Sequence, residues 1–292
     1  MKKSLRRSDS VAGVLLFLPA VVIVIVFKGV PLITGFYLSF TRPASILKNV
    51  FAGLVNYSRL VNDEIVHAAL INVLKSIVIL PAYILVPLFV AFLLYQRVKG
   101  WQFFRATYLF SYLLSPVMVG YIFSFVLGND GPVNSLLRTI GLGKLAIQWF
   151  GNTSSAMWMV LAVVLWTWFG LGALIYLAAM ASISEDLFES ATLEGATPRQ
   201  VLAHVIIPHI VPTISYWGVI CTAGLFLWLF PFLYALTEGG PGYATMMPEY
   251  YIYLTTTKFV DPGYASALGI SLFILIAILS SFQVRMMYSR EG

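Results

Sequence analysis

Six stretches of this chain are each long and apolar enough to cross a lipid bilayer, and no other feature constrains its fold as strongly. A spanning helix needs about 20 mostly apolar residues, because the hydrocarbon core is roughly 30 Å thick and a helix rises about 1.5 Å per residue. The stretches are residues 11–27, extended past Lys28 by 32–40, and residues 68–95, 106–127, 156–180, 210–235 and 265–287. None alternates in runs of about ten residues, as strands of a membrane barrel do. The sequence predicts an all-α membrane protein, a single six-transmembrane-helix bundle.

The composition excludes the soluble and the disordered classes of protein. Hydrophobic residues make up 60% of the 292 residues and charged ones only 10%, whereas soluble domains have roughly 45–50% and about 25%. A single cysteine, Cys221, excludes a disulfide framework and any site of several thiolates. The net charge of +6 comes from scattered Lys and Arg, so it indicates membrane orientation rather than a nucleic-acid partner.

The distribution of Lys and Arg predicts that both termini face the cytoplasm. Segments 1–10, 96–105, 181–209 and 288–292, with Arg285 at the end of the last span, carry ten basic residues, and the longer segments 41–67, 128–155 and 236–264 carry six. Cytoplasmic loops are the ones enriched in these residues. The first stretch also resembles a signal peptide in its basic start, but no small-x-small cleavage site follows it. We expect it to be retained as a span.

All twelve acidic residues lie outside the six stretches or at their ends. Proton-coupled carriers keep carboxylates or histidines at membrane depth, so energy for any transport is expected to come from another subunit. Lys75 is the one clearly buried charge, and it either snorkels toward the interface or serves a function. No nucleotide loop, metal-ligand spacing or nucleophile–base grouping is present. We therefore expect a chain that is not an enzyme and that binds no metal or cofactor.

Residues 182–208, between the fourth and fifth stretches, predict a cytoplasmic elbow of two short amphipathic helices. Ser182 with Glu185 forms a capping-box pattern, and Thr197 with Gln200 forms a second one. Gly195 between them allows the chain to reverse. A simple surface loop is the alternative, but it would not need this density of capping residues.

The elbow resembles the signature of the membrane subunits of binding-protein-dependent ABC importers. That pattern stands here as Glu189-Ser190-Ala191, then Gly195-Ala196, then Ile207-Pro208, with Ser190 in place of the usual alanine. The resemblance implies a type I importer bundle in which Glu189, Ser190, Ala191, Gly195 and Ala196 couple to an ATPase subunit.

A second motif narrows the resemblance to maltose-transporter-type sugar permeases. Residues 236–241, Leu-Thr-Glu-Gly-Gly-Pro, resemble the Leu-Thr-x-Gly-Gly-Pro turn of that group and follow the fifth stretch on the outer side. Leu18-Pro19-Ala20, Asn56-Tyr57 and residues 264–269 match as well. By this turn the chain resembles the first of two paired permeases. It departs from many relatives at Phe230-Pro231, where they have Phe-Asp, and we expect Pro231 to break the helix.

The resemblance implies a multi-pass protein of the inner (cytoplasmic) membrane of a prokaryote, in contact with membrane lipid. It implies three partners: a homologous second permease, an ATPase dimer that holds ATP and Mg, and an extracytoplasmic substrate-binding protein. The cargo it implies is a sugar or oligosaccharide, or alternatively a polyol or glycerol phosphate. An ion-coupled secondary carrier and a membrane scaffold are the rival classes, and the elbow argues against both.

Sugar sites use aromatic faces and hydrogen-bonding edges, so aromatic residues of the fourth and fifth stretches are candidates for the pathway. Trp228 and Phe232 are four residues apart and are expected to share a helix face. The remaining candidates are Thr222, Tyr234 and Trp166, with Trp168 and Tyr176 nearby. For each of them, packing against a neighbouring helix or lipid is the alternative role.

Overall fold

The computed structural model of the chain describes residues 16–45, 48–96 and 99–288. These residues form two units: one contains the residues up to Asp63 together with 252–273, and the other contains 64–251 together with the residues from 274 onward. The basic N-terminal tail, residues 11–15 of the first predicted span, Arg97 and Arg290 lie outside the described residues.

Within the described residues, five helices are long and apolar enough to span a membrane: 16–38, 64–95, 156–180, 198–227 and 262–283. The third predicted stretch is divided into α5 (Trp101–Leu113) and α6 (Pro116–Val126). Leu114 and Ser115 between them leave the helical conformation, with ψ 142° and 131°. At Ser115 this follows from Pro116, because the ring of a proline disfavours helical backbone at the residue before it.

The first unit begins with a helix that contains the π-helical turn η1 (Ile25–Gly29) and continues as α2 (Val30–Leu38). A hairpin of β1 (Thr41–Ser45) and β2 (Lys48–Phe51) follows, and it pairs antiparallel with Thr41 opposite Phe51. This hairpin departs from the all-α prediction. It precedes α3 (Val55–Asn62), and the unit also contains the first part of α14 (Pro262–Tyr288).

Polar contacts from α3 hold the first unit together. The buried Asn56 amide donates to the carbonyls of Ser39 at 2.8 Å and Thr41 at 2.7 Å. Arg59 forms a 2.8 Å ion pair with Asp261 and lies over the Tyr264 ring. The Arg59–Asp261 pair joins segments 202 residues apart in sequence, whereas the two Asn56 bonds reach 17 and 15 residues back along the chain.

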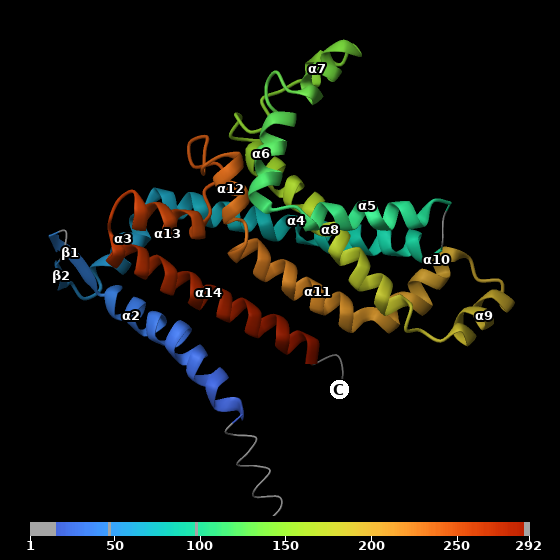
Figure 1. Cartoon of the computed structure of the whole chain (residues 1–292), viewed down its shortest axis with the longest axis horizontal. Coiled ribbons are helices and arrows are strands. Elements are labelled where there is room, and N and C mark those ends of the chain that lie inside the picture. Colours follow the sequence, from blue (N-terminus) through green and yellow to red (C-terminus); the bar gives the residue numbers. More distant parts are fainter. Residues whose placement is uncertain (1–15, 46–47, 97–98, 289–292) are drawn as a thin grey trace, which may run out of the picture. The chain divides into compact units, whose positions relative to one another are not determined.

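The second unit is a helical bundle built around α8 (Ala156–Met180). It packs against α4 (Glu64–Tyr95) and α5, and α11 (Ile207–Leu227) packs against both α4 and α8 (Figure 1). The short helix α12 (Phe230–Leu236) packs on α6. The remaining elements are α7 (Pro132–Thr139), η2 (Gly143–Leu145), α9 (Glu185–Leu193), α10 (Pro198–Val201) and η3 (Leu202–Ile206), together with the first four residues of α13 (Pro248–Thr257), whose other residues belong to the first unit.

Small residues and buried hydrogen bonds hold the bundle together. Gly172 of α8 leaves room for the Trp217 ring, since a Cβ there would lie 2.7 Å from it. The indole N–H of Trp217 donates to the Tyr83 carbonyl at 3.0 Å, and the Tyr83 hydroxyl donates to the Leu161 carbonyl at 2.6 Å. One tyrosine thus links α4, α8 and α11. Packing and interhelical hydrogen bonds of this kind replace the hydrophobic effect, which does not drive helices together within lipid.

Replacing Gly170 with alanine should destabilise this unit, because the new Cβ would meet the backbone carbonyl of Tyr108 in α5. Overpacking of this kind costs roughly 1–3 kcal/mol. The matched control is Gly269→Ala in α14, where nothing lies within 4 Å of the added atom. Thermal unfolding in mild detergent should show a lower midpoint for Gly170→Ala than for the control; equal midpoints would contradict the close approach of α5 and α8.

Candidate functional site

The elbow consists of α9, a reversal at Gly195 and α10, as the sequence predicts. Gly195 has φ +76°, a left-handed conformation that glycine adopts without steric cost. The capping box at the start of α10 is confirmed: the Thr197 backbone N–H donates to Gln200 Oε1 at 2.8 Å, and the Gln200 N–H donates to Thr197 Oγ1 at 3.4 Å.

The predicted capping box at Ser182 is wrong. Helix α9 begins at Glu185 with Ser184 as its N-cap, and no side chain caps it. The Ser182 hydroxyl instead donates to the Ala179 carbonyl at 2.8 Å, because a serine at the end of a helix finds a free carbonyl of the preceding turn. The acidic Glu185 and Asp186 still lie in the first turn of α9, where the helix dipole favours them.

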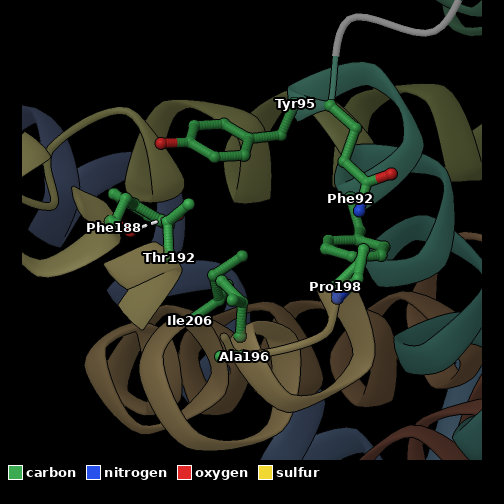
Figure 2. Close-up of a pocket in the computed structure, with 9 residues that line it drawn as sticks. Phe92, Tyr95, Phe188, Thr192, Ala196, Pro198 and Ile206 are labelled. Carbon is green, nitrogen blue, oxygen red and sulfur yellow. Dashed lines mark hydrogen bonds between the residues drawn. The ribbon is translucent and has the colours of Figure 1, made fainter. Parts of the chain in front are cut away.

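An aromatic contact joins the elbow to the end of α4. The rings of Tyr95 and Phe188 lie 5.4 Å apart. Beside them a pocket of about 370 Å³ opens between the end of α4 and the elbow, and Phe92, Ala196 and Ile206 also line it (Figure 2). The elbow is therefore a packed structure with a defined position on the bundle.

The residues predicted for coupling differ in how exposed they are on this elbow. Glu189, Ser190 and Gly195 are exposed, and Ala191 and Ala196 are half-buried. Leu193 on the same segment is 89% exposed among the described residues, although its side chain is apolar. Four of these five residues are small: Ser190, Ala191, Gly195 and Ala196.

The fifth predicted span is broken as the sequence predicts. Helix α11 ends at Leu227, and α12 begins at Phe230 with Pro231 in its first turn. The break changes one expectation: Trp228 and Phe232 do not share a helix face. Trp228 lies in the break and is 55% exposed, whereas Phe232 is fully buried. A spacing of four residues aligns side chains only along a continuous helix.

The other pathway candidates lie in different surroundings and are not brought together into one site. The Thr222 hydroxyl is nearly buried, donates to the Gly218 carbonyl at 2.9 Å and accepts from Gln283 at 2.8 Å. Tyr234 stacks on Phe230, and Trp166 meets Phe123 edge-on at 5.0 Å. Tyr234 and Trp166 are each about 40% exposed. Trp168 contacts Trp228 edge-on at 6.2 Å.

The Gly-Gly-Pro motif forms a compact turn after α12. Gly239 has φ +84°, and the Thr245 hydroxyl lies 2.7 Å from both the Gly240 carbonyl and the Thr237 hydroxyl. The Asn72 side chain of α4 reaches this turn from outside it and bonds to its backbone. Sequence reasoning missed Asn72, although a polar residue within an apolar span was a usable signal.

Sequence reasoning also missed Glu249 in α13. Its carboxylate accepts hydrogen bonds from the backbone N–H groups of Phe230 and Leu229, at the start of α12, and its Oε1 has no partner among the described residues. Burial raises the pKa of this carboxyl from 4.5 to about 8, outweighing the two N–H groups, which lower it. The helix break is thus closed by a side chain whose charge changes near neutral pH.

Comparisons with known proteins agree with this geometry. Residues 8–290 match the family described as the binding-protein-dependent transport system inner membrane component. The chain belongs to this family. The lactose transport system permease protein LacF of Rhizobium radiobacter is 30% identical to it over 97% of this chain and 96% of the relative. The arabinooligosaccharides transport system permease protein AraP of Bacillus subtilis is 29% identical over 99% and 93%.

A solved structure shares the fold of this family member. A chain of a bacterial ABC transporter involved in the import of the acidic polysaccharide alginate superposes with a TM-score of 0.84, covering 97% of this chain and 96% of that one at 24% identity. The chain therefore shares its fold with a permease of an ABC importer, and the family membership expected from the two sequence motifs is confirmed.

The free energy of unfolding should fall as pH rises from about 5 to 8. In the folded protein Glu249 keeps its proton up to a pKa of about 8, whereas in the unfolded chain it loses the proton near pH 4.5. Glu249→Gln, which is neutral throughout, should flatten that part of the profile. Thermal unfolding midpoints of both proteins across this pH range would check it. A profile of the same slope in the variant would show that Glu249 does not carry the dependence.

Proposed function

We propose that this chain is a permease subunit of an ATP-driven, binding-protein-dependent importer that moves a carbohydrate across the cytoplasmic membrane of a prokaryote. The observation that supports the proposal is the elbow, on which Glu189, Ser190 and Gly195 are exposed and Ala191 and Ala196 are half-buried. Relatives named for lactose and arabinooligosaccharide transport support a sugar or oligosaccharide as the cargo.

In this proposal the chain crosses the membrane six times with both termini in the cytoplasm, and it pairs with a homologous second permease. An ATPase dimer binds ATP and Mg, while this chain carries no cofactor and catalyses no reaction. Docking of a loaded binding protein at the outer face promotes ATP binding, and the elbow transmits the resulting ATPase movement to α11 through η3. A rigid elbow suits this role because a deformable loop would absorb the movement.

The first test is purification of the chain in mild detergent with its native membrane partners, followed by ATPase assays with binding proteins loaded with lactose, arabinooligosaccharides, alginate oligosaccharides, a polyol or glycerol phosphate. We expect copurification of a second permease and an ATPase, with hydrolysis stimulated by one carbohydrate. Stimulation only by the polyol or by glycerol phosphate would show that this compound is the cargo, and the importer architecture would stand. A chain without ATPase whose uptake follows an ion gradient would overturn the proposal.

Gly195→Ala should uncouple ATP hydrolysis from uptake or release the ATPase, because a side chain at φ +76° costs about 1–2 kcal/mol and distorts the reversal. Gly141→Ala is a closely matched control: Gly141 has φ +81°, and at both positions nothing lies within 4 Å of an added Cβ. Copurification and the ratio of sugar transported to ATP hydrolysed should change only for Gly195→Ala. If both variants behave alike, the elbow is not the coupling element.

Trp228→Ala should reduce uptake about tenfold or more without changing assembly, because an exposed indole at the helix break offers a face on which a sugar ring can stack. Trp158→Ala, which removes a tryptophan that is 39% exposed on α8, is the control. Initial uptake rates at several sugar concentrations measure the effect. Unchanged uptake by the Trp228 variant would remove this residue from the pathway.

A further inference from the structure

Lys75 lies well inside the second spanning helix. It is 11 residues after the start of α4 at Glu64, which corresponds to roughly 16 Å along the helix axis. A charged side chain at such a depth is costly and is usually kept for a purpose or directed toward the interface. In this structure the Lys75 ammonium turns back toward the start of α4. It also has a specific partner there, because it donates to Asn72 Oδ1 at 2.9 Å.

The Asn72 amide is fully used in this arrangement. Its Nδ2 donates to the Tyr243 carbonyl at 3.1 Å and to the Met246 carbonyl at 2.9 Å, and its side chain is 1% exposed. An amide flipped by 180° would direct its oxygen at these two carbonyls and its N–H groups at an ammonium, which has no acceptor. The two carbonyls and the Lys75 ammonium therefore favour the same orientation of the Asn72 amide, and Lys75 reinforces it with a charged donor.

The segment that Asn72 holds has an unusual backbone. Tyr243 has φ +66° and follows Gly242 at φ +52°, and its side chain is 44% exposed. A non-glycine residue in this conformation costs about 1–3 kcal/mol and persists only where its surroundings impose it. The two hydrogen bonds from Asn72 contribute to that constraint, because they hold the carbonyl of Tyr243 itself and that of Met246, three residues later.

The turn and the elbow lie at opposite ends of the same span. The fifth span starts from the elbow at Pro198, continues through α11 and α12, and ends at Leu236, directly before the turn. The turn and the elbow, which the proposed function assigns to the ATPase, are therefore joined by one continuous segment of chain, residues 198–236. This segment also contains the break at Leu229, where the helix can bend.

We propose that Lys75 is a positioning residue for transport. Through Asn72 it holds residues 239–246 in the conformation that a loaded binding protein contacts. This inference rests on the proposed importer function. Lys75 touches neither the sugar nor the ATPase. It sets how strongly the binding protein stimulates ATP hydrolysis through this permease.

The test uses the complete importer with Lys75→Met, and Leu74→Met as the matched control. Both changes place methionine on the same turn of α4, and Leu74 is an exposed apolar residue. In Lys75→Met, hydrogen–deuterium exchange should be about tenfold faster at the N–H groups of Ala244, Thr245 and Met246, which bond within the turn. The loss of a hydrogen bond to a charged group corresponds to at least that factor. The control should exchange like the wild type.

ATPase assays test the functional half of the proposal. For Lys75→Met, the concentration of sugar-loaded binding protein that gives half-maximal stimulation should rise about tenfold, while hydrolysis without binding protein stays unchanged. Lys75→Arg, which keeps a donor for Asn72 Oδ1, should restore most of the stimulation. Because Lys75 acts through Asn72, the double variant Lys75→Met with Asn72→Ala should show the same stimulation as Asn72→Ala alone. Two residues with independent structural roles would instead give additive effects.

The outcomes separate this inference from the importer proposal. If the wild-type complex hydrolyses ATP in response to a loaded binding protein but Lys75→Met matches Leu74→Met in both exchange and stimulation, the role of Lys75 is wrong and the importer stands. Faster exchange with unchanged stimulation would show that the turn is held by Lys75 but does not serve transport, which also overturns the proposal. A wild-type complex without stimulated hydrolysis would overturn the importer itself.

Discussion

The absence of water in the bilayer core is the constraint on which the rest of this structure depends, because every backbone N–H and C=O there needs a partner within the protein. Continuous helices meet this need along most of the chain. Where the fifth span is interrupted at Leu229, the buried Glu249 carboxylate accepts the N–H groups that the break leaves open. A polar side chain from α13 thereby allows an irregular backbone beside the exposed Trp228, at the point where the permease fold is expected to interact with its cargo.

A second group of polar side chains holds the Gly-Gly-Pro turn against α4. Asn72 satisfies two carbonyls of the segment that follows the Gly-Gly-Pro motif, and Lys75 satisfies Asn72. The elbow is held differently, by a capping box at Thr197 and an aromatic contact between Tyr95 and Phe188. The two ends of the fifth span are therefore each anchored to α4, one by hydrogen bonds and one by apolar packing. This arrangement suits a span that transmits movement between its ends.

The two sequence motifs were sufficient to identify the family, and local chemistry was sufficient for much of the elbow. Gly195, Thr197 and Gln200 act within a few residues of one another, so their geometry could be predicted from spacing alone. Predictions that needed an unbroken helix were less secure. Trp228 and Phe232 were expected on one face, but the break at Pro231 separates an exposed ring from a buried one. Ser182 was expected to cap a helix that instead begins two residues later, after Ser184.

The sequence by itself determined the class of protein, the approximate spans, the elbow and the family, because apolar length, charge bias and capping are local properties of a chain. Only the tertiary structure decided which polar residues matter within the apolar spans. Asn72 lies 171 residues from Tyr243, and Tyr83 lies 134 from Trp217; no local pattern records such pairs. Hydrogen bonds of this kind depend on which helices pack together, and packing is a property of the whole bundle.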